Sequence, residues 1–131
     1  MIHCMDFRLG GTVKRYLEEN NLLDDCDIVS VAGAAKNIAA PEHESEREFI
    51  MKQIETSKRL HGITDLILKN HTDCGAYGGR NAFSSRDEER KKHSDHLMKA
   101  AEIVKGKYPE LRVRTLLADT EDSGKINILP L

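Results

Sequence analysis

Short apolar runs that alternate with amphipathic stretches are the feature of this sequence that most narrows its possible folds. The apolar runs cover residues 2–5, 27–32, 66–69, 113–118 and 126–129. The run over 27–32 is rich in β-branched residues, and the run over 66–69 is nearly continuous in apolar residues, like strands buried on both faces of a parallel sheet. The helical spacing of apolar residues predicts helices over 12–20, 41–60 and from Ser85 to about Lys107. This alternation predicts an α/β fold with a four- to five-stranded, mostly parallel sheet.

Turn and cap residues mark where the predicted elements end. The glycines at 10–11 are expected to break the chain before the first helix, and Gly62 to end the second. Ser85 and Glu88 form a capping-box pattern at the start of the third helix. Residues 122–124 have turn chemistry, so the last two strands are expected to pair as a hairpin.

Length and composition narrow the class of protein. The chain has 131 residues, which predicts one domain over 1–131, and only 39% are hydrophobic, which favours a homo-oligomer over a lone small core. The net charge is −2, so no basic excess favours nucleic acid or an anionic membrane. No apolar run approaches the ~20 residues needed to span a bilayer. The start lacks the pattern of a signal peptide. We therefore expect a cytoplasmic protein.

Reactive side chains cluster after two of the predicted strands. Cys4, Asp6 and Arg8 follow the first strand, and His71 and Cys74 follow the third. The carboxyl ends of parallel strands lie at one edge of a sheet, so one crevice can hold both clusters. Two thiolates and one imidazole suit Zn²⁺, which prefers sulfur and nitrogen ligands. An odd number of cysteines also fits a reducing compartment better than a disulfide framework.

The role of Asp6 has two interpretations. Cys4, His71 and Cys74 supply three ligands and leave a fourth position, which is the pattern of catalytic zinc sites. Alternate residues of an extended segment point the same way, so Cys4, Asp6 and Arg8 are expected to face the metal together. Asp6 could ligate zinc directly and close the site. Alternatively, it could pair with Arg8 and accept a hydrogen bond from zinc-bound water.

Taken together, Cys4-x-Asp6-x-Arg8 followed by His71-x-x-Cys74 within HTDCG resembles the β-class carbonic anhydrases. The words CMDFR and SVAGA (30–34) are similar to the family's CMDSR and Asn-Ala-Gly segments. The resemblance covers about residues 1–79, the Rossmann-like core of a three-layer domain, and more loosely the closing strands.

The resemblance implies a function and an assembly. Cys4, His71 and Cys74 would hold zinc, and Asp6 and Arg8 would form the catalytic dyad. Zinc-bound hydroxide would attack CO2 to give bicarbonate, since zinc brings the pKa of bound water near 7. The family forms dimers or multiples of dimers, with active sites near the subunit interface.

Several positions depart from the family pattern. Phe7 replaces the usual Ser, Asn70 replaces the usual Gly, and Lys36 and Asn37 follow an altered Ala-Gly segment. The chain starts close to Cys4, without the family's helical arm. Two further hypotheses therefore stay open: a related enzyme acting on carbonyl sulfide or carbon disulfide, and a non-catalytic or redox-sensing zinc protein.

Four other residues and one charged run have simpler interpretations. Cys26 is expected to pack, and His3 to point to the face opposite Cys4, where a role in proton transfer is the alternative. His93 and His96 are expected to lie in solvent on the third helix, and the charge run 86–92 to form a solvated helix face.

Overall fold

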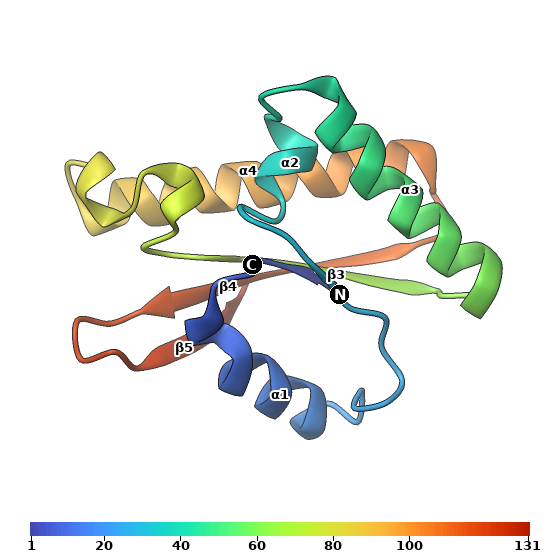
Figure 1. Cartoon of the computed structure of the whole chain (residues 1–131), viewed down its shortest axis with the longest axis horizontal. Helices are drawn as coiled ribbons and strands as arrows, with labels where there is room; N and C mark the ends of the chain where they lie inside the picture. Colours follow the sequence, from blue (N-terminus) through green and yellow to red (C-terminus); the bar gives the residue numbers. More distant parts are fainter.

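The computed structural model describes residues 1–131 and contains one sheet of five strands in the order β2-β1-β3-β4-β5 (Figure 1). The strands are β1 (Ile2–His3), β2 (Val29–Ser30), β3 (Asp65–His71), β4 (Arg112–Thr120) and β5 (Ile126–Pro130). Strands β1 to β4 are parallel, and β5 pairs antiparallel with β4. The predicted α/β fold, its mostly parallel sheet and its closing hairpin are confirmed.

Helices cover both faces of this sheet, which makes a Rossmann-like three-layer arrangement (Figure 1). The helices are α1 (Gly10–Glu19), α2 (Lys36–Ala39), α3 (Glu44–His61) and α4 (Arg86–Lys107). Helix α1 lies on one face and the other three helices on the opposite face. Ile67 and Leu68, consecutive residues of β3, enter separate apolar clusters because strand side chains alternate between faces. No helix is both long and apolar enough to cross a membrane.

Gly62 caps α3 as predicted, whereas the capping box predicted for α4 forms only in part, because Glu88 Oε2 accepts from the backbone N–H of Ser84 and not of Ser85. Gly62 ends α3 in the left-handed conformation, with φ of 62°. The Ser85 side chain accepts a hydrogen bond from the backbone N–H of Glu88 at the start of α4. The predicted inward residues of α4 are buried; they are Leu97, Ala100, Ala101 and Val104.

Other predicted boundaries were wrong. Gly10 and Gly11 do not break the chain but begin α1, because the 3-10 turn Phe7–Leu9 leads directly into it. Strands β1 and β2 are only two residues long, and α2 was not predicted at all. Such short elements are set by tertiary pairing rather than by a periodic pattern, which needs a longer run to be visible.

Candidate metal centre

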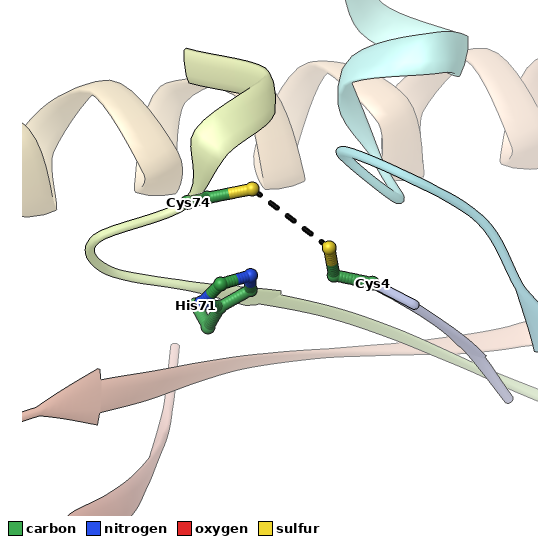
Figure 2. A group of neighbouring side chains, drawn as sticks. All are labelled: Cys4, His71 and Cys74. Carbon is green, nitrogen blue, oxygen red and sulfur yellow. Dashed lines mark hydrogen bonds between the residues drawn. The ribbon is translucent and has the colours of Figure 1, made fainter. Parts of the chain in front are cut away.

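Two thiols and an imidazole meet at the carboxyl end of β1 and β3 (Figure 2). Cys4 directly follows β1, His71 is the last residue of β3, and Cys74 lies in the loop that follows. Their potential ligand atoms lie within 4.8 Å of one another, and all three residues are buried. The two sulfurs are 3.8 Å apart, joined by the dashed line in Figure 2. Parallel pairing of β1 with β3 produces this meeting, as expected from the sequence.

The ring of His71 is oriented by the backbone. Its Nδ1 lies 2.8 Å from the carbonyl oxygen of Thr72, which can only accept, so Nδ1 carries the proton. The lone pair is then on Nε2, which is buried without a hydrogen-bond partner. A buried imidazole nitrogen fixed in this tautomer by its second nitrogen is the arrangement found in metal-ligating histidines.

The two thiols influence each other's protonation. The hydrogen bond with Cys74 lowers the pKa of Cys4 against the opposing effect of burial, with help from His71 and the backbone of Gly33. The same hydrogen bond, together with burial, raises the pKa of Cys74. Gly33 has φ of 76°, and a Cβ there would lie 3.0 Å from the Cβ of Ala76, so the turn beside the thiols requires glycine.

Asp6 and Arg8 form an ion pair beside this cluster. The Arg8 Nη2 is 2.7 Å from Asp6 Oδ2, and its Nε is 3.0 Å from Asp6 Oδ1. These hydrogen bonds are the main reason that the pKa of Asp6 is lowered to about 2. Asp6 Oδ2 lies 3.9 Å from His71 Nε2. The extended geometry expected for this segment is wrong, because Asp6 caps the 3-10 turn that contains Arg8.

The donor set fits a zinc ion. Two sulfurs and one unpartnered imidazole nitrogen lie close enough to share one cation, and all come from buried residues. Zinc accepts this combination of thiolate and imidazole in tetrahedral geometry. The thiol protons of Cys4 and Cys74 would be released when a metal binds, because the ligand is the thiolate.

The other singled-out residues lie outside this cluster. Cys26 is half-buried and packs against the apolar cluster under α1, as expected. His3 is buried, with Nδ1 2.7 Å from the carbonyl oxygen of Cys4. The expectation for His93 and His96 was wrong, since both are buried. They face Tyr77, whose ring centroid is 4.1 Å from that of His93 and whose hydroxyl is 3.0 Å from Nδ1 of His96.

The charge run 86–92 is not a solvated face throughout, which corrects a second expectation. Glu89 is only 1% exposed and accepts a hydrogen bond from the backbone N–H of Asp73. Its burial has a visible sequence signal, because Glu89, His93, His96 and Ala100 follow the 4-3-4 spacing of one helix face. The charged residue types of the run nevertheless favoured the expectation of solvent exposure, because charged residues are seldom buried.

Comparisons with known proteins identify the family. The family described as "Putative carbonic anhydrase" matches residues 1–128. An uncharacterized protein of Rickettsia bellii (strain RML369-C) is 33% identical over 120 residues, which cover 89% of this chain and 73% of that protein. An uncharacterized protein of Rickettsia conorii (strain ATCC VR-613 / Malish 7) is 32% identical over 120 residues, covering 89% of this chain and 64% of that protein. No solved structure matches the chain. The match over nearly its full length shows that the chain belongs to this carbonic anhydrase family.

Proposed function

We propose that the protein catalyses the reversible hydration of CO2 to bicarbonate with a zinc ion held by Cys4, His71 and Cys74. The observation that carries this proposal is the unpartnered, buried Nε2 of His71 among two thiols, with a carboxylate–guanidinium pair beside them. Membership of the carbonic anhydrase family supports the same reaction.

The chain's own residues have distinct roles in this proposal. Cys4, His71 and Cys74 would hold the zinc ion, which would make hydroxide available near neutral pH by lowering the pKa of water. Asp6 remains ionised, since Arg8 holds its pKa at about 2, and so offers a carboxylate that accepts a hydrogen bond from water at the fourth metal position. Arg8 orients that acceptor through three N–H···O contacts to the carboxylate.

The proposal also covers the compartment and the assembly in which the enzyme acts. The enzyme acts on a small molecule in the cytoplasm as one domain that forms homodimers or larger homo-oligomers, without nucleic-acid or membrane partners. The nearly balanced charge supports the absence of polyanionic partners. The exposed side chains of Met5 and Phe7, which neighbour the dyad in sequence, support a second copy of the chain as a neighbour.

A second candidate function is a closed zinc site without catalysis, in a structural or redox-sensing protein. Two contacts favour it: Asp6 Oδ2 lies 3.9 Å from His71 Nε2, and the two sulfurs are 3.8 Å apart. Asp6 is therefore within a short movement of becoming a fourth ligand. A related enzyme that hydrolyses carbonyl sulfide or carbon disulfide would use the same site, with Phe7 altering its surroundings.

The decisive experiment is stopped-flow CO2 hydration by zinc-loaded protein between about pH 6.5 and 9, the range in which zinc-activated water titrates. We expect activity in the parent and losses of about a hundredfold or more in Asp6→Asn and Arg8→Ala, since a hydrogen-bonding group positioned at the reacting atoms contributes about 10²–10³. Carbonyl sulfide and carbon disulfide are assayed in parallel. A zinc-loaded parent that hydrates no CO2 contradicts the proposal.

Zinc affinity of Asp6→Asn, measured by chelator competition, separates the open from the closed site. With three strong ligands left in place, we expect a loss of less than about a hundredfold, the upper range for residues that only support ligands. A larger loss would make Asp6 a required ligand and favour the non-catalytic candidate.

A further inference from the structure

A buried carboxyl group on α4 reaches the loop that carries Cys74. Glu89 is 1% exposed, and its Oε1 accepts the backbone N–H of Asp73 at 2.5 Å. Its Oε2 has no hydrogen-bond partner, and the nearest cationic nitrogen, Nε of Arg80, is 3.7 Å away. Burying a carboxyl group with one oxygen unpartnered lowers the stability of the fold, which points to a role for the contact with Asp73.

Asp73 stands between the candidate ligands His71 and Cys74 in an unusual conformation. Its φ is 56°, in the left-handed region that few residues other than glycine adopt. The hydrogen bond from its N–H to Glu89 stabilises this turn. The turn directs the Asp73 carboxylate to two donors, the backbone N–H of Arg80 at 3.1 Å and Nη1 of Arg8 at 2.8 Å.

Arg8 is therefore held from two sides. Its Nε and Nη2 donate to the carboxylate of Asp6, as described above. Its Nη1 donates to the Asp73 carboxylate, and its Nη2 also donates to the Asp73 carbonyl oxygen at 2.9 Å. A guanidinium anchored by this second partner cannot follow Asp6 if that carboxylate moves toward the ligand cluster.

We propose that Glu89 and Asp73 are positioning residues: Glu89 fixes the turn at Asp73, and Asp73 anchors Arg8 so that Asp6 is retained away from Cys4, His71 and Cys74. The inference rests on the proposed function, because it explains how the fourth metal position stays free of a protein ligand. Loss of either residue releases Arg8 and lets Asp6 reach the metal.

The test is zinc affinity by chelator competition, which needs no turnover. In Asp73→Asn we expect zinc to bind about fivefold or more tightly, because Asp6 becomes a fourth ligand, while CO2 hydration falls at least tenfold. In the double variant Asp6→Asn/Asp73→Asn the tightening should vanish. A merely structural role for Asp73 would loosen zinc or leave its affinity unchanged, and either result overturns the proposal.

Variants of Glu89 test whether this side chain fixes the turn at Asp73. Glu89→Met removes the acceptor for the Asp73 N–H and should tighten zinc as Asp73→Asn does, whereas Glu89→Gln keeps an acceptor and should retain the parent affinity. If Glu89→Met fails to fold, Asp73→Asn alone still decides. Asp65→Asn is the matched control, because Asp65 pairs with Arg112 at the opposite end of β3 and should change neither readout.

Activity and affinity together separate the two proposals. A parent without CO2 hydration but with the expected affinity pattern would remove the proposed function and leave the positioning role standing. An active parent whose Asp73→Asn variant shows neither tighter zinc nor lower activity would remove the positioning role alone.

Discussion

At the scale of single residues, the closely spaced thiols of Cys4 and Cys74 are the feature that depends most on a bound cation. Two buried sulfurs 3.8 Å apart cannot both ionise without a cation between them, so a metal ion bound by both would stabilise the folded chain. We predict that Cys74→Ser lowers the zinc content from about one per chain to below about a tenth, and lowers the thermal unfolding midpoint of protein prepared with zinc. Metal analysis and calorimetry measure the two effects.

Cys26→Ser is the matched control for this change. Cys26 is half-buried and packs under α1, where its sulfur lies 3.4 Å from the amino group of Met1. The variant should keep about one zinc per chain. Equal zinc in the Cys74→Ser and Cys26→Ser proteins would contradict the assignment of Cys74 as a ligand.

The juxtaposition of Cys4, His71 and Cys74 could be predicted from sequence, whereas the surroundings of Arg8 could not. Parallel strands place their carboxyl ends at one edge, and this rule needs only the order of the elements. The contact of Arg8 with Asp73 depends on one left-handed residue in a loop, which no periodic pattern reveals. The burial of Glu89 follows the helical spacing of α4, but its charged residue type argued against burial.

At the scale of elements, α4 depends on its amino-terminal cap, and its first turn carries the charged residues that frame the site. The Ser85 hydroxyl accepts from the N–H of Glu88, one of the donors that a helix leaves unpaired at its start. We predict that Ser85→Ala lowers the free energy of unfolding by about 1 kcal/mol. Urea denaturation followed by circular dichroism measures it.

Ser94→Ala, within the same helix, is the matched control. Alanine has the higher helix propensity, so this variant should unfold at the same or a slightly higher urea concentration. If both variants lose the same free energy, the effect belongs to serine burial and not to the cap.

The elements that could be predicted are those long enough to show a period. Strands β3 and β4 and the helices α3 and α4 are within a few residues of the predicted ranges. β2 is shorter than predicted because only Val29 and Ser30 pair in register with β1. Beyond them the chain keeps single bonds to β1, such as Val31 N to the carbonyl of His3 at 3.0 Å, before turning at Gly33.

At the scale of the whole molecule, exposed apolar side chains flank the Asp6–Arg8 ion pair. Phe7 is 92% exposed and Met5 is 65% exposed, and both flank Asp6 in sequence. We predict a homodimer at tens of micromolar, and a shift toward monomer in Phe7→Asp, measured by light scattering. Phe49→Asp, a control at an exposed phenylalanine of α3, should stay dimeric. A monomeric parent would contradict the prediction and weaken the proposed function.

The buried imidazole of His93 makes the stability of the whole fold depend on pH. Its ring is fully buried with neither nitrogen hydrogen-bonded, and burial is the main cause that lowers its pKa to about 4. In the unfolded chain a histidine titrates near pH 6.5. Between about pH 6.5 and pH 4, therefore, the unfolded chain binds a proton that the folded chain does not. Stability must fall as the pH falls through this window, by at most about 3 kcal/mol from this residue.

We predict that His93→Leu flattens this part of the pH dependence, because leucine binds no proton in either state. Urea unfolding of metal-free parent and variant at several pH values between about 4 and 7 measures it, and the absence of metal removes any contribution from zinc release. The variant loses packing against Tyr77, so its stability at pH 7 can differ from the parent's; the slope is the diagnostic quantity. Replacement of the exposed His43 by leucine is the matched control for the loss of one histidine. Equal slopes in His93→Leu and the parent would show that His93 is protonated alike in the folded and unfolded chains, contrary to the prediction from its burial.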